Sequence, residues 1–343
     1  MPTILAMDAG GTSTRAVVLD TTGLCLGYGR AGTGNPTAAG IDQAIDELAL
    51  AAERAIVAGE VAGRATTVPD SLGVVSLAGS VSQPFVDGLT KRLSALGVTS
   101  LSLQPDLLGT YYSGTIATEG TGVIVGTGAV AGRISDGALE FTRGGTGWLL
   151  GDDGSGFWIG QRVARAVIAA LDGLAPATKL TELVLAFFGI EQKPGIVRGR
   201  PSALIELMEQ LYALRPVDLA RLAPFAFEAA QDQVARGILE EAAVAIGQLL
   251  ASTRSAHDNG PVVLGGSILA AGVRVAPDIF ARRLTEASHG GELIAVADGV
   301  VGAAVLGLRQ SGVVVDEQLF ARLRGGIATL SDSASSIATP GQA

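Results

Sequence analysis

The first part of the chain alternates between short apolar runs and turns rich in glycine and hydroxyl groups. Residues 4–7 and 15–19 are apolar runs of the length of buried strands, and a third strand is expected from residue 24. The turn between the first two strands reads DAGGTST and has almost no side-chain bulk. The pattern predicts a meander of three strands with an unusually open first turn.

The same pattern recurs at residues 123–141, VIVGTGAVAGRISDGALEF. An apolar strand leads into a Gly-Thr-Gly turn, a second strand and, after a Ser-Asp-Gly turn, a third strand. Two similar meanders, one opening each half of the chain, indicate an internal duplication. Paired turns of this kind can face each other across a cleft.

Strands and helices alternate after the first meander, which predicts a doubly wound α/β arrangement with ligands beyond the carboxyl ends of the strands. Helices are expected over residues 38–58, 82–96 and 107–118, with strands over 72–78 and 100–103. In the second half, helices are expected over residues 158–171, 180–188, 202–211, 225–256 and 299–309, with strands over 261–264 and 292–296. The tail from residue 325 is small and polar and is expected to be disordered.

The first turn has the composition of a phosphate site. Gly10 and Gly11 permit positive φ and close backbone approach, and Thr12 adds a hydroxyl. Clustered amides and hydroxyls bind phosphate oxygens, and the carboxylate of Asp8 at the rim can hold a hydrated magnesium ion (Mg2+). Either glycine turn alone could be an ordinary hairpin turn, but its recurrence favours the phosphate interpretation.

Three further sites, two single residues and one glycine pair, each have two interpretations. Asp106 follows a strand and is either the N-cap of the next helix or a general base that takes a proton from a hydroxyl nucleophile. Asn35 is either a turn former before Pro36 or a hydrogen-bond partner of a sugar hydroxyl. Gly265 and Gly266 either form a plain strand-to-helix turn or let a purine lie against the backbone.

Residues 144–156, GGTGWLLGDDGSG, are the densest glycine segment and precede a predicted helix. Glycines beside two carboxylates and a serine at a helix N-terminus favour a binding loop. The alternative is that Asp152 and Asp153 only complement the helix dipole.

The composition of the chain excludes several classes of protein. The 343 residues leave room for two domains, and 48% hydrophobic against 17% charged residues indicates a folded chain. A net charge of −9 argues against a nucleic-acid partner. The longest apolar runs, near residues 242–251 and 299–308, are too short to span a membrane, and no signal peptide is visible, so we expect cytoplasmic residence without a membrane partner.

Cysteine and histidine usage excludes several kinds of site. The single cysteine, Cys25, excludes an intrachain disulfide and a four-cysteine metal site, and its place in a strand predicts a packed core thiol. His257 and His289 lack metal-ligand spacing and are expected at the surface.

The ordered set of motifs over residues 4–310 resembles the actin/hexokinase/Hsp70 ATPase superfamily. Within it, the chain is similar to the N-acetylglucosamine kinases and the related BadF/BadG/BcrA/BcrD ATPases. The resemblance implies two actin-like (ribonuclease H-like) domains, each with a mixed five-stranded sheet flanked by helices, and ATP in the cleft between them. The domains would span residues 1–117, joined by the helix at 298–310, and residues 118–297.

The resemblance also implies roles for individual residues. The ATP phosphates would be bound at Gly10, Gly11, Thr12, Gly126, Thr127 and Gly128, and the adenosine at Gly265 and Gly266. Asp8 would hold Mg2+ through water, and Asp106 would be the catalytic base. The sugar would be contacted by Asn35, Asp106, Gly145, Thr146, Gly147 and Asp152.

Two departures from the family pattern concern the sugar pocket. Thr146 stands where the family commonly has tryptophan, although Trp148 is nearby. Ala129 and Val130 stand where animal N-acetylglucosamine kinases have serine and asparagine, so an acetamido contact is not carried over. The resemblance therefore supports a sugar kinase better than it supports N-acetylglucosamine as the substrate.

The resemblance thus implies an ATP-dependent amino-sugar kinase, a homodimer that phosphorylates the 6-hydroxyl of N-acetylglucosamine. Glucosamine or another sugar is the alternative substrate. One rival function is an ATPase that activates a partner enzyme through a bridging iron–sulfur cluster, but that branch typically has two cysteines per subunit and this chain has only Cys25. The other rival is a non-catalytic sugar or nucleotide sensor.

Overall fold

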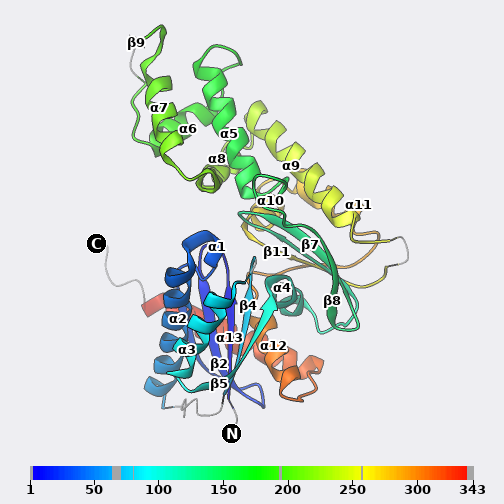
Figure 1. Cartoon of the computed structure of the whole chain (residues 1–343). Coiled ribbons are helices and arrows are strands. Elements are labelled where there is room, and N and C mark those ends of the chain that lie inside the picture. Colours follow the sequence, from blue (N-terminus) through cyan, green and yellow to red (C-terminus); the bar gives the residue numbers. More distant parts are fainter. Residues whose placement is uncertain (1–2, 64–70, 80, 193–194, 256–257, 338–343) are drawn as a thin grey trace. The chain divides into compact units, whose positions relative to one another are not determined.

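The computed structural model describes residues 3–63, 71–79, 81–192, 195–255 and 258–337 (Figure 1). The chain divides into two compact units. Unit 1 consists of residues 1–122, 134–140 and 294–343, and unit 2 consists of residues 123–133 and 141–293. Unit 1 is therefore assembled from both ends of the chain. The expected position of ATP between two domains stays a prediction.

The sheet of unit 1 contains the first predicted meander. Its strands are β1 (Thr3–Ala9), β2 (Thr14–Asp20), β3 (Cys25–Ala31), β4 (Ser71–Leu77) and β5 (Val98–Pro105), in the order β3-β2-β1-β4-β5. The β1–β2 and β2–β3 pairs are antiparallel, whereas β1–β4 and β4–β5 are parallel. This confirms a mixed five-stranded sheet, and its central strand β1 is buried throughout.

Helices cover both faces of this sheet. On one face α2 (Ile41–Val61) and α3 (Gln83–Ser94) share a core with β1, in which Leu5, Met7 and Phe85 are buried. On the other face α12 (Val300–Gln310) packs on β1, β4 and α4 (Asp106–Gly114). The helix predicted over residues 38–58 is divided at Gly40 into α1 (Pro36–Ala39) and α2.

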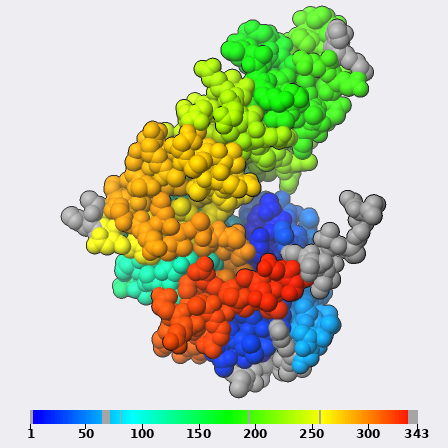
Figure 2. Space-filling view, turned by 180° about the vertical axis from the view of Figure 1, so that it is seen from behind, coloured from blue at the N-terminus to red at the C-terminus, as the bar shows by residue number. Residues whose placement is uncertain are grey.

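The expected disorder from residue 325 is wrong for residues 325–337. These residues belong to α13 (Glu317–Ile337), which packs against β3 and is seen in red at the surface of unit 1 in Figure 2. A Cβ atom at Gly326 would lie 3.1 Å from the Sγ atom of Cys25, so the small residues permit close helix packing. Cys25 is buried, as predicted. Residues 338–343 lie outside the described residues.

The second sheet repeats the order of the first. It consists of β12 (Leu293–Ala295), β11 (Val262–Gly265), β6 (Gly120–Val125), β7 (Ala129–Ser135) and β8 (Ala138–Gly144), in the order β12-β11-β6-β7-β8. The meander β6-β7-β8 takes the place of β1-β2-β3, and β11 and β12 take the places of β4 and β5. This shared order supports the predicted internal duplication.

Unit 2 contains more helices than the sequence predicted. They are α5 (Gly156–Leu171), α6 (Lys179–Phe187), α7 (Ser202–Ala213), the 3-10 helix η1 (Pro216–Leu222), α8 (Ala223–Glu228), α9 (Gln233–Ala251), α10 (Ser267–Val275) and α11 (Pro277–Ala287). A short hairpin, β9 (Ile196–Val197) and β10 (Arg200–Pro201), precedes α7. Neither α10 nor α11 was expected.

The long helix predicted over residues 225–256 is wrong. It is broken between α8 and α9, where Asp232 caps α9 by accepting hydrogen bonds from the N–H groups of Val234 and Ala235 at 3.0 and 3.1 Å. The same carboxylate accepts a hydrogen bond from the Thr178 hydroxyl. A carboxylate at this position favours a helix start over a helix interior.

Two remaining expectations concern the histidines and membrane-spanning helices. His289 is exposed, as predicted, whereas His257 lies outside the described residues. Among the described residues, no helix is both long and apolar enough to cross a membrane.

Candidate active site

Two carboxylates of unit 1 lie at the same edge of its sheet. In the parallel ladder Asp8 of β1 is opposite Ser76 of β4, and Leu77 of β4 is opposite Pro105 of β5. Asp106 directly follows Pro105 and begins α4. Asp106 is near enough to Asp8 to raise the pKa of that carboxyl through charge repulsion. The structure thus brings together two of the predicted site residues.

Asp8 is buried within a small network of charged groups. Its Oδ2 atom accepts a hydrogen bond from the N–H of Gly299 at 3.1 Å and lies 3.6 Å from Nη1 of Arg15. Arg15 also contacts Asp298, with Nε 3.1 Å from Oδ2. Burial, followed by the charge of Asp298, raises the pKa of Asp8 to about 7, although the Gly299 N–H and Arg15 oppose the shift.

Arg15, Asp298 and Gly299 were missed by the sequence reasoning. The sequence could have indicated a role for Arg15, because it is the only charged residue in the apolar run of residues 15–19. Asp298 and Gly299 precede the apolar helix α12, which was predicted, but nothing in the sequence placed that helix start beside Asp8.

Asp106 is the first residue of α4, and the N-cap position belongs to Pro105. The capping interpretation is therefore wrong by one residue. Burial raises the pKa of Asp106 to about 6, against the hydrogen bond from the Leu107 backbone. A carboxylate with a pKa near the working pH suits a general base.

Burial of Asp8 predicts that removing its charge stabilises the protein. The folded state binds a proton more tightly than the unfolded chain, whose aspartate pKa is about 3.9, so this group's contribution to stability is lost as pH rises from about 4 to 7. We expect Asp8→Asn to increase the free energy of unfolding at pH 8 by up to about 4 kcal/mol.

Urea unfolding of Asp8→Asn and the wild type at pH 5, 6.5 and 8 measures this effect. The advantage of the variant should shrink as the pH falls. Asp87→Asn, on the exposed side of α3, is the matched substitution at a solvent-exposed position. A constant or reversed difference between Asp8→Asn and the wild type would contradict the burial argument.

The first glycine turn and Asn35 lie in the same unit. Gly10 donates its N–H to the carbonyl of Ser13 at 3.1 Å and accepts the Thr33 hydroxyl at 3.1 Å. Gly10 does not use the positive φ that glycine permits, but a Cβ atom there would lie 3.2 Å from the Ser13 carbonyl oxygen. Asn35 is a turn former, as one interpretation held, because its Oδ1 caps α1 through the Thr37 N–H at 2.8 Å. A sugar contact by its Nδ2 amide stays a prediction.

The second glycine turn, residues 126–128, is hydrogen-bonded to the N-terminus of α5 in unit 2. Gly156 donates its N–H to the carbonyl of Gly126 at 2.7 Å, and Phe157 donates to the carbonyl of Thr127 at 3.1 Å. The turn closes on itself through the Gly126 N–H and the Gly128 carbonyl at 2.9 Å. Its carbonyl oxygens are therefore occupied, while Thr127 is exposed at the tip.

Gly266, in the predicted adenosine motif, follows β11, which lies next to β6 in the second sheet. Its φ is +99°, and a Cβ atom would lie 2.3 Å from the carbonyl oxygen of Val125. Val125 immediately precedes Gly126, so the β11–α10 turn and the second glycine turn are neighbours within unit 2. Only glycine combines this backbone conformation with this approach.

The loop at residues 144–156 is held by Asp152. This residue has φ of +60° and a buried side chain, and burial raises its pKa although the N–H groups of Ala129 and Gly147 donate to its carboxylate. In the described part of the chain, its Oδ1 atom has no hydrogen-bond partner. A buried acceptor without a partner is costly, so it favours a ligand hydroxyl at this position over a role limited to the helix dipole.

Two other predicted sugar residues, Gly145 and Gly147, lie in the same loop as Asp152. A Cβ atom at Gly128 would lie 2.7 Å from Oδ2 of Asp152, and one at Gly145 would lie 3.2 Å from a methyl group of Val130. Gly145 and Gly147 have positive φ, of +65° and +86°. Trp148 packs against the ring of Phe157, with 5.5 Å between centroids. An apolar side chain, Val130, thus lines this part of unit 2.

Unit 1 thus carries Asp8 and Asp106 at one sheet edge, and unit 2 carries Gly266 beside the second glycine turn. The family model of the BadF/BadG/BcrA/BcrD ATPase family matches residues 5–307, and the chain belongs to this family. The sequence-based recognition of the superfamily is thereby confirmed.

Relatives of known name include two kinases of amino sugars. The chain is 26% identical over 325 residues to N-acetyl-D-glucosamine kinase of Dictyostelium discoideum, which covers 89% of this chain and 97% of that protein. It is 27% identical over 188 residues to glucosamine kinase of Vibrio cholerae, which covers 54% of this chain and 60% of that protein.

Solved structures agree with the fold. A protein from Chromobacterium violaceum, provisionally assigned as an N-acetylglucosamine kinase, superimposes with a TM-score of 0.69 at 27% identity and covers 90% of this chain and 99% of its own. A glucokinase of Streptomyces griseus in complex with glucose and AMPPNP has a TM-score of 0.52 at 19% identity, covers 89% of this chain and 98% of its own, and shows the fold alone.

Proposed function

We propose that the protein is an ATP-dependent kinase that phosphorylates the 6-hydroxyl of an amino sugar, with N-acetylglucosamine the first candidate. The observation that carries the proposal is Asp106, a carboxylate with a raised pKa at the same sheet edge as Asp8. The full-length similarity to an N-acetyl-D-glucosamine kinase supports it.

In the proposed reaction, Asp106 accepts the proton of the sugar hydroxyl as its oxygen forms a bond to the γ-phosphorus of ATP. The bond between that phosphorus and the β,γ-bridging oxygen breaks, and ADP leaves. The turns at Gly10, Gly11 and Thr12, and at Gly126, Thr127 and Gly128, would bind the phosphates through threonine hydroxyls and through the backbone amides that the turns do not use internally. The adenosine would lie at Gly265 and Gly266. The partnerless Oδ1 of Asp152 would accept a sugar hydroxyl.

Asp8 is the residue proposed to hold Mg2+ through water. Among the described residues, no group of three His, Cys, Asp or Glu side chains could hold an ion directly, which suits an ion that keeps most of its water. When bound, Mg2+ neutralises the charge of the ATP phosphates. The raised pKa of Asp8 fits this role, because a nearby cation would stabilise its ionised form.

Val130, which lies against the predicted sugar residue Gly145, affects whether N-acetylglucosamine or glucosamine is the better candidate substrate. Its methyl groups face Gly145, so this side chain offers no hydrogen bond to an acetamido group. The named relatives include kinases of both sugars. Glucosamine is therefore the alternative substrate, and we further propose a cytoplasmic homodimer, which light scattering would test by its mass.

The decisive experiment measures ADP release from magnesium-ATP with glucosamine, N-acetylglucosamine, N-acetylmuramic acid, N-acetylmannosamine and glucose. Release that depends on one sugar supports the kinase and names its substrate. Sugar-independent hydrolysis would favour the partner-activating ATPase, although Cys25 is buried and poorly placed to ligate a shared cluster. Tight sugar binding without turnover would favour the sensor.

The two raised pKa values predict the pH dependence of the reaction. Asp106 must be ionised to accept a proton, and Asp8 must be ionised to attract Mg2+. With pKa values of about 6 and about 7, kcat/KM should rise from pH 5 to 8 and level off above that. Initial rates at low concentrations of both sugar and magnesium-ATP over this range test the prediction, because bound Mg2+ would lower the pKa of Asp8. A profile that is flat between pH 5 and 8 would contradict the assigned roles.

A further inference from the structure

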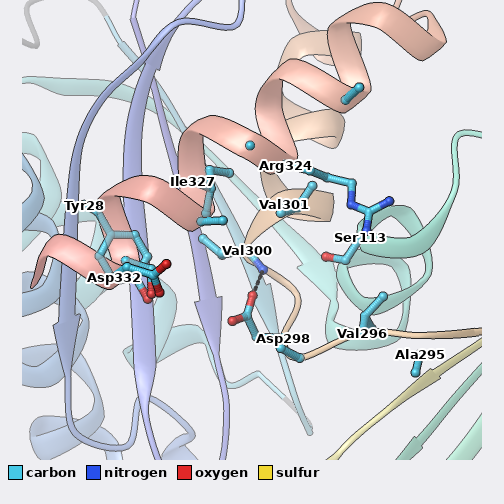
Figure 3. Close-up of a pocket in the computed structure, with 15 residues that line it drawn as sticks. Tyr28, Ser113, Ala295, Val296, Asp298, Val300, Val301, Arg324, Ile327 and Asp332 are labelled. Carbon is cyan, nitrogen blue, oxygen red and sulfur yellow. Dashed lines mark hydrogen bonds between the residues drawn. The ribbon is translucent and has the colours of Figure 1, made fainter. Parts of the chain in front are cut away.

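A pocket of about 630 Å³ lies within unit 1, between α13 and the segment that joins β12 to α12 (Figure 3). Tyr28 of β3 and Ser113 of α4 also line it. The family match ends at residue 307, so α13 lies beyond the matched segment. The pocket is therefore built partly from family elements and partly from a helix outside them.

The sequence of α13 explains why a pocket remains there. Leu323 and Ile327 are buried and hold the helix against the rest of unit 1. Ala321, Gly325 and Ala328 line the pocket at spacings of four and three residues, which places them on one face of the helix. Because these side chains are small, the helix leaves space between itself and Val300 and Val301.

Charges of opposite sign stand at the two ends of this pocket. Arg324 and Asp332 both line it and are eight residues apart, which is about 12 Å along a helix. In Figure 3 the Arg324 side chain lies toward Ser113, and Asp332 lies toward Tyr28. Asp298 adds a second carboxylate to the lining.

The two terminal charges have no ion-pair partner among the residues that the structure describes. Arg324 lies over the ring of Phe320, with 5.7 Å to the centroid, and this contact leaves its guanidinium donors available. Val300, Val301 and Ile327 form an apolar part of the lining, which also contains the polar side chains of Tyr28 and Ser331. This arrangement suits a ligand with a cationic end, an acceptor end and a compact body.

We propose that this pocket is a second binding site for a small primary ammonium compound of the size of an amino sugar or its phosphate ester. The ammonium group would pair with Asp332 and Asp298, and Arg324 would bind a hydroxyl or a phosphate at the other end. Free amino sugar and its phosphorylated form share this chemistry. The phosphate ester would bind Arg324 more strongly than the free amino sugar would.

Asp298 connects this site to the candidate active site. Its carboxylate lines the pocket and also pairs with Arg15, which contacts Asp8. A ligand ammonium at Asp298 competes with Arg15 and thereby changes the surroundings of Asp8. By linkage, magnesium-ATP and the pocket ligand then alter each other's affinity by the same factor. This coupling, unlike the binding itself, rests on the proposed function.

Methyl NMR of Val300, Val301 and Ile327 in the full-length protein tests the binding. Titration with glucosamine and with glucosamine 6-phosphate should shift these signals, whereas N-acetylglucosamine and glucose, which lack the ammonium, should not. Asp332→Asn should weaken the binding of both amines about fivefold, the effect of losing a partly solvated ion pair. Arg324→Ala should weaken the phosphate ester more than the free sugar.

Matched controls lie on the same helix outside the pocket lining. Glu317→Gln and Arg322→Ala remove the same kinds of charge from exposed positions and should leave both titrations unchanged. Equal shifts with N-acetylglucosamine, unmoved pocket methyls with every amine, or equal effects of the controls would overturn the proposal. The pocket can pass this test even if no sugar is phosphorylated, so its failure and that of the proposed function are distinguishable.

Discussion

Asp106→Asn is expected to lower kcat about 10²- to 10⁴-fold, the usual contribution of a general base. Asparagine keeps the shape of the side chain but cannot accept the proton of the sugar hydroxyl. The Michaelis constant for ATP should change little, because Asp106 is not among the residues proposed to bind phosphate. Steady-state kinetics with the preferred sugar measures both quantities.

The thermal stability of Asp106→Asn shows whether a loss of turnover comes from lost chemistry or from lost structure. Burial raises the pKa of Asp106, so neutralising the side chain should not destabilise the folded state at neutral pH. A slow variant with an undiminished melting temperature would therefore have lost chemistry and not structure. Asp87→Asn, in the same unit, should retain wild-type turnover. Near-wild-type turnover of Asp106→Asn would remove Asp106 from the mechanism.

Gly266→Ala is expected to raise the Michaelis constant for ATP at least about tenfold and to lower the melting temperature. A non-glycine residue at φ of +99° costs about 1–3 kcal/mol of strain. The added methyl would also lie 2.3 Å from the Val125 carbonyl, so the β11–α10 turn must move away from the strand that leads into Gly126. Both parts of the proposed nucleotide site in unit 2 are then displaced.

Gly199→Ala separates backbone strain from this contact. Gly199 lies in the β9–β10 hairpin with φ of +80°, and a Cβ atom there would meet no atom within 4 Å. This control should lose some stability but keep its affinity for ATP. Calorimetry and ATP kinetics on both variants distinguish the two effects. Equal outcomes for Gly199→Ala and Gly266→Ala would show that the approach to Val125 does not matter for the nucleotide.

Much of the fold followed from local patterns. Apolar runs of strand length separated by glycine turns located the strands of both meanders, because side-chain periodicity and turn chemistry are local properties. The position of Asp106 after a strand was enough to expect it at a ligand-binding sheet edge. The structure places Asp8 and Asp106 at that edge.

Errors arose where distant parts of the chain decide the structure. The contact between Asp8 and Gly299 joins residues 291 positions apart, so no local pattern indicates it. In α13, small residues suggested a loose tail, but at Gly326 they allow close approach to Cys25. The break before α9 depends on Asp232 also accepting a hydrogen bond from Thr178, 54 residues away.

The hydrogen bond from Gly299 to Asp8 has a consequence for biosynthesis. A ribosome releases residue 8 first and residue 299 only after the whole of unit 2 has been made. Until then β1 lacks α12, which covers it in the finished protein, and Asp8 lacks its backbone donor. The nascent chain therefore completes the environment of Asp8 last, and a chain cut short before residue 299 carries the glycine turns without the finished carboxylate network.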